Sequence, residues 1–172
     1  MAVSADCCFA QSIVRLNQVG TNDWNFHNSI SDEQRHIYYC TREVVNINSL
    51  NVTCMSKDLA IRWSYNYDNP GIEPISGMSY KDGKLYITTD LQSDVMILVL
   101  DKMGTVLSSK RMFSGNTTFA SSVMHNNDLV IANSYNTSDA SVQITRLNAS
   151  FNTVFNKRII FASGSFFPVM TN

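Results

Sequence analysis

The feature that most constrains the fold is a segment that recurs along the chain at a nearly constant spacing. A short apolar run followed by a polar turn repeats around four apolar anchor residues, which are Leu16, Met55, Leu100 and Leu147. Successive anchors lie 39, 45 and 47 residues apart. Repeats of this length with several short strands in each are typical of β-propeller blades, where each blade is one small sheet. The spacing therefore predicts an all-β chain built from similar sheets.

The best-defined repeat shows what one blade should contain. Its four expected strands are separated by polar turns and cover residues 72–79, 85–89, 95–100 and 105–112. The third of these runs is continuously apolar, which favours a strand that is buried on both faces. Turn signals every 8–12 residues or so indicate antiparallel hairpins. Each blade is therefore expected to be a four-stranded antiparallel sheet.

The same pattern predicts how the ring closes. Residues 164–170 match an innermost strand, and residues 1–6 match a second strand. The C-terminal strand is therefore expected to complete the N-terminal blade, which would remove free sheet edges. The alternative is that the chain forms half of an eight-bladed ring. The predicted blades of this single domain, residues 1–172, are 164–172 with 1–27, then 28–67, 71–112 and 117–161.

Large apolar side chains recur eight residues after three of the anchors. They are Trp24, Trp63 and Phe155. Because the position is the same in each repeat, we expect these side chains to pack between neighbouring blades rather than to bind a ligand.

Short motifs of the turn-bearing strands resemble those of bacterial-type β-propeller repeat families. RLNQVG and RLNAS resemble a segment of delta-60 repeats, and LDKMG and DGKLYI resemble SBBP-type and quinoprotein-like blades; these motifs occupy residues 15–20, 146–150, 100–104 and 82–87. The resemblance implies the propeller fold. It transfers no functional residue, because such families include surface proteins, scaffolds and some enzymes. The chain departs from the pattern at Leu59 and Phe151, where the other repeats have glycine.

Composition excludes several classes of partner. The net charge of −1 and the pI of about 6.3 give no electrostatic basis for binding nucleic acid or an anionic membrane. No apolar run approaches the roughly 20 residues of a membrane span. Residues 1–12 lack the basic and apolar regions of a signal peptide. The expected location is extracellular if the chain is a trimmed module of a secreted protein, and cytoplasmic otherwise.

Few residues carry chemistry of their own. Among the four cysteines, Cys40 and Cys54 lie on neighbouring expected strands and form a candidate disulfide, with buried free thiols as the alternative. The pattern contains no metal-binding spacing, no cofactor motif and no catalytic motif, so we expect no metal, cofactor or catalytic residue. The three histidines stand alone in the sequence.

Four sequons are the recurring exposed feature. They begin at Asn51, Asn116, Asn136 and Asn148. Three of the four asparagines fall in expected loops, where an attached glycan is sterically feasible. The alternative is coincidence in a chain rich in Asn, Ser and Thr.

These observations favour a non-catalytic binding or structural module that interacts with a protein partner or with itself. One alternative is a strand-exchanged subunit of a larger ring or filament. Another is an enzyme with a site in the central channel. The enzyme alternative would gain support if Glu73 and His125 came within hydrogen-bond reach at one channel mouth.

Overall fold

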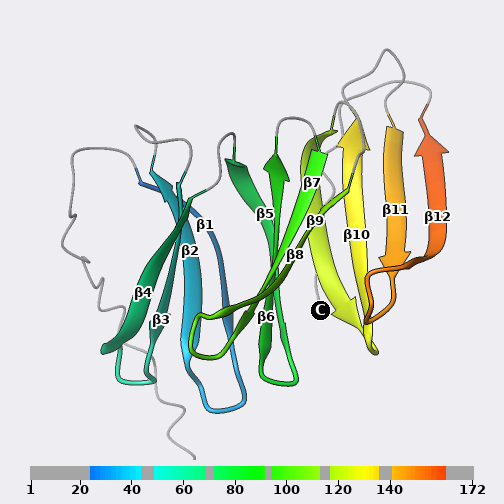
Figure 1. The fold of residues 1–172 in the computed structure, drawn as a ribbon. Coiled ribbons are helices and arrows are strands. Elements are labelled where there is room, and N and C mark those ends of the chain that lie inside the picture. The colour runs from blue at the N-terminus through cyan, green and yellow to red at the C-terminus, as the bar shows by residue number, and fades with distance from the viewer. Residues whose placement is uncertain are drawn as a thin grey trace, which may run out of the picture.

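The computed structural model describes residues 24–43, 49–68, 72–91, 94–112, 117–135 and 141–161, which form an all-β fold. Within them, three four-stranded antiparallel sheets each follow chain order (Figure 1). The first sheet contains β1 (Trp24–Ser31), β2 (Ile37–Glu43), β3 (Ser49–Met55) and β4 (Ile61–Asp68). The second contains β5 (Ile72–Lys81), β6 (Lys84–Leu91), β7 (Asp94–Asp101) and β8 (Val106–Met112). The third contains β9 (Thr117–His125), β10 (Asp128–Tyr135), β11 (Ser141–Leu147) and β12 (Thr153–Ile160).

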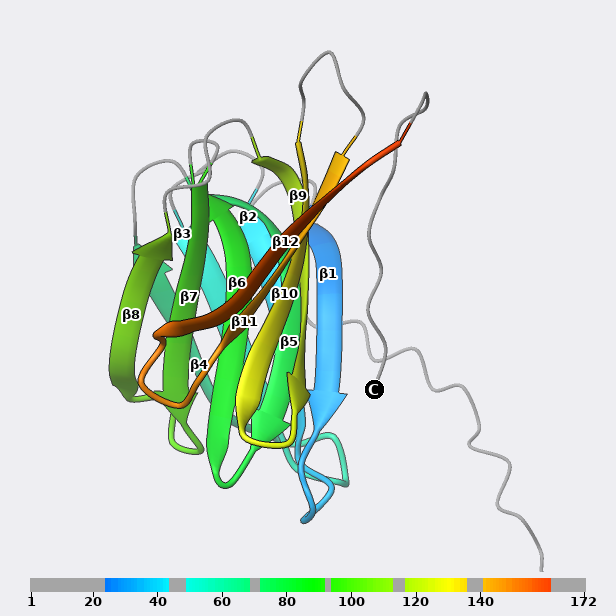
Figure 2. The same cartoon turned by 90° about the vertical axis from the view of Figure 1, so that its right-hand side faces the viewer.

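The first strand of each sheet lies near the centre of the molecule, and the fourth lies at its rim. β5 contacts β1 on one side and β9 on the other. From these central strands the first sheet extends to the left, the second toward the viewer and the third to the right in Figure 1. After the turn of Figure 2, the third sheet faces the viewer and the second lies to its left. This is the blade arrangement of a β-propeller, and the predicted fold class is confirmed.

The strand predicted to be buried on both faces is β7. Residues 94–100 are all buried, because the second sheet is covered by another sheet on each side. Met96, Leu98 and Leu100 belong to the core between the first and second sheets. The alternate residues Val95, Ile97 and Val99 belong to the core between the second and third sheets. A strand between two cores needs apolar side chains at every position, and its sequence supplies them.

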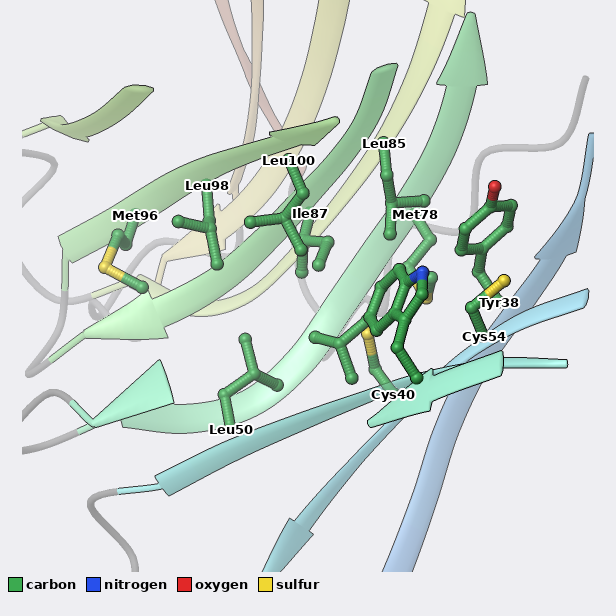
Figure 3. Close-up of a cluster of buried hydrophobic side chains, with 12 residues drawn as sticks. Tyr38, Cys40, Leu50, Cys54, Met78, Leu85, Ile87, Met96, Leu98 and Leu100 are labelled. Carbon is green, nitrogen blue, oxygen red and sulfur yellow. The ribbon is translucent and has the colours of Figure 1, made fainter. Parts of the chain in front are cut away.

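The first core joins the first and second sheets (Figure 3). Side chains of β2, β3 and β4 meet those of β5, β6 and β7 there. Leu50, Leu85 and Leu100 are fully buried, and each contributes about 1.5–3 kcal/mol relative to an exposed side chain. Tyr38 stacks on Tyr80 at a ring distance of 5.5 Å, which extends the core toward the lower turns.

The second and third sheets approach each other closely at Gly77 of β5. A Cβ atom on this residue would lie 2.5 Å from the Ser122 backbone nitrogen and 2.7 Å from Thr88 Oγ1. Thr88 Oγ1 and Ser122 Oγ are hydrogen-bonded at 2.8 Å across the same contact. Glycine is therefore required for this approach of β5 to β9.

One predicted boundary differs from the structure. Trp24 to His27 were expected in the outermost strand of an earlier blade, but they belong to β1, where Trp24 pairs with Glu43. The chain is too short here for both strands, because only 16 residues separate Leu16 from Asp32, whereas 27 separate Met55 from Asp82. The remaining segments of the proposed closing blade, residues 1–23 and 162–172, lie outside the described residues, so ring closure stays a prediction.

No helix long and apolar enough to cross a bilayer occurs in the part of the chain that the structure describes.

Candidate interaction surface

Among the described residues, one five-residue turn occurs four times at the lower rim of the sheets. Its first residue is Asp32, Ser56, Asp101 or Asn148. In each turn the backbone nitrogen of the first residue donates to the carbonyl of the fifth, and the nitrogen of the fourth donates to the carbonyl of the first. The side-chain oxygen of the first residue also accepts from the backbone nitrogen of the fifth. The fourth residue has a positive φ in every case, and it is Arg35, Leu59, Gly104 or Phe151.

Side chains of the first sheet hydrogen-bond to the β7–β8 turn of the second sheet and pack against it. Trp63 Nε1 donates to the Lys102 carbonyl at 3.0 Å, and Tyr67 Oη donates to the Gly104 carbonyl. A Cβ on Gly104 would lie 2.7 Å from the Tyr65 ring, so only glycine fits under that ring. Burial, with smaller contributions from neighbouring charges, raises the pKa of Tyr67 to about 12 and keeps it a hydrogen-bond donor. The outermost strand of one sheet thus holds the turn of the next.

The same kind of contact joins the second and third sheets. Lys110 Nζ of β8 donates to the carbonyl of Phe151, which is the left-handed residue of the β11–β12 turn. The Phe151 side chain packs against the second core. In both contacts a carbonyl of the left-handed residue accepts from a side chain of the preceding outermost strand. The sheets are therefore held at the rim as well as through their cores.

An apolar surface lies along the joint between the first and second sheets. We call it the seam patch, and it consists of Tyr65 of β4 and Met103 of the β7–β8 turn, next to Gly104 that the Tyr65 ring covers. Met103 is 56% exposed, and Tyr65 is 49% exposed. The Tyr65 ring stacks on buried Trp63 at 5.5 Å, so it is held in place from below. The patch combines exposed apolar area with a rigid base.

A second apolar surface lies on the third sheet. Phe155 is 47% exposed and Ile159 is 37% exposed. Both lie on the face of β12 that corresponds to the faces of β4 and β8 in contact with the next sheet. Trp63 is buried as expected for packing between blades, but Phe155 at the equivalent position has no covering sheet among the described residues. Trp24 lies in β1 and is therefore not equivalent to Trp63. The predicted equivalence of Trp24 is wrong, whereas packing of Phe155 against a further blade stays a prediction.

The main titratable cluster of the described residues is built around Asp32. Its Oδ1 accepts from the backbone nitrogens of Gln34 and His36 at 2.9 and 2.8 Å. Its Oδ2 accepts from His36 Nδ1 at 2.7 Å and from Tyr38 Oη at 3.1 Å. Arg62 of β4 donates to His36 Nε2. Because arginine can only donate, Nε2 must accept, which places the ring proton of His36 on Nδ1.

This network keeps Asp32 ionised. Burial alone would raise the pKa of the Asp32 carboxyl, but hydrogen bonds from the His36 side chain, the His36 backbone and Tyr38 outweigh it and lower the pKa. Sequence reasoning treated His36 as an isolated histidine. The signal that could have revealed the pair is the position of Asp32, which begins a turn as Asp101 does, with His36 as the fifth residue.

Cys40 and Cys54 do not form the candidate disulfide, since both are free and buried. The register pairs Cys40 with Val52 and Cys54 with Tyr38, so the cysteines are diagonal rather than opposite. Diagonal residues of an antiparallel pair lie about 7–8 Å apart, beyond the usual reach of a disulfide. Burial raises the pKa of both thiols. The alternative of buried free thiols is what the structure shows.

The sequons differ in their surroundings. Asn51 lies on β3, and its Nδ2 donates to Asn66 Oδ1 at 2.7 Å and to Ser64 Oγ at 3.2 Å on β4. A glycan on this nitrogen would replace one of those hydrogens. Asn148 uses Oδ1 to hold its turn, which does not involve the nitrogen. Asn116 and Asn136 lie outside the described residues. Glycosylation at the four sites stays a prediction.

The backbone does not bring Glu73 and His125 together at one channel mouth, which was the arrangement that would have supported an enzyme. Glu73 lies near the start of β5, and His125 ends β9. Figure 1 shows the β5–β6 and β9–β10 turns at the same end of the molecule, so these two residues lie near opposite ends of their strands. Within the described ranges, no group of three His, Cys, Asp or Glu residues is placed to hold a metal ion.

Comparison with known proteins supports the fold alone. No known protein family and no curated protein matches the chain. Among solved structures it is similar to one described as a europium-containing methanol dehydrogenase, with 15% identity and a TM-score of 0.53. It is also similar to the Dos1 propeller, with 9% identity and a TM-score of 0.50.

Both similarities cover 78% of this chain but only part of the other protein. The chain spans 27% of the methanol dehydrogenase and 34% of the Dos1 propeller. At these identities the likeness establishes a propeller fold and says nothing about activity. The narrower resemblance to delta-60, SBBP-type or quinoprotein-like repeats is not confirmed.

Proposed function

We propose that this chain is a non-catalytic β-propeller module that binds another protein through the seam patch. The observation that carries the proposal is the exposure of two large apolar side chains, Tyr65 and Met103, at the joint between two sheets. Scattered single apolar residues are normal on a protein surface, whereas neighbouring ones on a fixed base are typical of interaction sites.

The support of the patch favours binding rather than chance exposure. Tyr65 is stacked on Trp63, and the turn that carries Met103 is fixed by the hydrogen bond from Trp63 to Lys102. A surface that is already ordered loses little conformational entropy when a partner covers it. Aromatic residues on such a base commonly carry a large share of the binding energy. Tyr65 and Met103 are therefore the expected anchors.

The test is site-specific photocrosslinking in the natural source of the protein. A photoreactive residue at position 103 should give a protein adduct, because a bound partner would cover Met103. The same residue at position 160 is the control, because Ile160 is 62% exposed and lies on β12 of the third sheet, away from the joint between the first and second sheets. Equal yields at the two positions, or no adduct at 103, would refute the proposal.

A second candidate function follows from the third sheet. Its exposed residues Phe155 and Ile159 occupy positions where the other sheets meet a further blade. This favours a subunit that associates with another copy to build a larger ring or filament. The two candidates are separable, because Phe155→Lys should abolish self-association and leave crosslinking at position 103 unchanged.

A further inference from the structure

A single side chain links the inner and outer parts of the first sheet at its lower end. His36 ends the β1–β2 turn, and its ring receives a hydrogen bond from Arg62 on β4, the outermost strand. On its other side the ring donates to Asp32, whose carboxylate is also held by two backbone nitrogens. The Asp32 carboxylate is therefore held in place by the turn. The position of Arg62, in contrast, depends on its hydrogen bond to the His36 ring.

We propose that His36 is a proton-sensitive latch that holds Arg62, and with it the start of β4, against the β1–β2 turn. In the neutral ring, Nε2 is the acceptor that Arg62 needs. A proton taken from solvent at Nε2 converts this acceptor into a donor and places a second positive charge against the guanidinium group. The hydrogen bond from Arg62 is then lost, while Asp32 retains the ring through a charge-assisted hydrogen bond.

Several other titratable or charged groups surround the His36 ring. The titratable or charged groups around it are Asp32 and Glu33 in the turn, Tyr38 on β2, Cys54 on β3, Arg62 on β4 and Tyr80 on β5. Burial raises the pKa of Tyr38, Cys54 and Tyr80, so these three stay neutral. Histidine is the side chain that ordinarily changes charge between about pH 5 and 8.

The latch lies directly beside the seam patch, and its functional consequence rests on the proposed function. Arg62 directly precedes Trp63, on whose ring Tyr65 of the patch is stacked. Arg62 is the extra residue of a bulge in β4, because Cys54 pairs with Trp63 and Met55 pairs with Ile61. Its hydrogen bond to His36 therefore holds the segment of β4 that supports Tyr65. Releasing Arg62 loosens this strand, and binding at the seam patch weakens as the pH falls.

The latch is tested first in the purified full chain without a partner. Nitrogen-15 NMR of the His36 ring should show the proton on Nδ1 and none on Nε2 at about pH 8. The guanidinium protons of Arg62 should exchange more slowly than those of exposed Arg35, and this protection should disappear by about pH 5. A proton on Nε2 at the higher pH, or protection of Arg62 that persists at the lower pH, would overturn the inference.

A variant with a permanent acceptor gives the matched test. In His36→Gln the amide oxygen can accept from Arg62 but does not titrate, so protection of Arg62 should remain at both pH values. His125→Gln is the control, because His125 is exposed at the end of β9, and it should leave the pH dependence unchanged. Loss of the pH dependence in the control instead would contradict the assignment to His36.

Crosslinking at position 103 then tests the regulatory part separately. The yield should fall several-fold from about pH 8 to about pH 5 in the unmodified chain and stay constant in His36→Gln. A yield that falls equally in both chains would overturn regulation by His36. Absence of crosslinking at every pH would refute the proposed function, while the NMR result would still decide whether the latch exists.

Discussion

At the fourth position of the recurring turn, contacts with a neighbouring sheet determine whether a residue other than glycine is tolerated. Arg35, Leu59, Gly104 and Phe151 all take positive φ. A left-handed backbone costs a non-glycine residue roughly 1–2 kcal/mol, and three of the four turns tolerate this cost. Gly104 differs because the Tyr65 ring fills the space that its side chain would need. Glycine is required there by the neighbouring sheet as well as by the backbone.

Two glycine variants separate these effects. Gly83→Ala should cost only the backbone term, about 1 kcal/mol, because nothing lies within 4 Å of an added Cβ. Gly104→Ala should cost about 1–3 kcal/mol more, because its Cβ would overlap Tyr65. Urea unfolding of both variants measures the difference. Equal losses would mean that the contact between Tyr65 and the turn is absent in solution.

Asp32 should make the stability depend on acid. Its pKa is lowered in the folded chain from an ordinary value of 3.8, so the unfolded chain binds more protons in that range. The stabilisation is present above that value and is lost as the pH falls through the folded pKa. Asp32→Asn should cost about 1–3 kcal/mol at neutral pH, since its amide nitrogen cannot accept from His36 or Tyr38. Unfolding free energies measured at several pH values should converge below that range.

At the scale of elements, the contact of β4 with the β7–β8 turn is expected to contribute strongly to stability. Trp63→Ala should cost about 3–5 kcal/mol, because the buried indole leaves a cavity and the Lys102 carbonyl loses its donor. Tyr67→Phe removes only the hydrogen bond to Gly104 and should cost about 0.5–1.5 kcal/mol. Denaturant titrations provide both values, and a reversed order would contradict the described packing.

The sequence predicted those elements whose pattern is local. The run 95–100 became β7 because continuous apolar character reports burial on two faces. Trp63 was placed between blades because its spacing from Met55 repeats. The strand β1 was misassigned, because its polar sequence and the turn after it lack the pattern of β5 and β9. The seam patch and the contact of His36 with Arg62 could not be predicted, since they depend on residues from different strands meeting in space.

At the scale of the whole molecule, the arrangement of the sheets bears on ring closure. The three sheets leave one side, between the third and the first, without a described strand (Figures 1 and 2). Closure of this side by the chain itself stays a prediction. For a self-closed ring, a native mass spectrum at nanomolar concentration should show a monomer near 19.3 kDa. A persistent dimer would support the half-ring, and added hexose mass would show that sequons are used.

The buried thiol of Cys40 can report how often the first and second sheets separate. Cys40 is fully buried between the first two sheets, and burial raises its pKa, so both access and the reactive thiolate are withheld. An alkylating reagent can reach it only when those sheets separate. The rate of alkylation, measured on the Cys40 peptide by mass spectrometry, therefore reports how frequently the two sheets separate. The measurement needs no engineered probe.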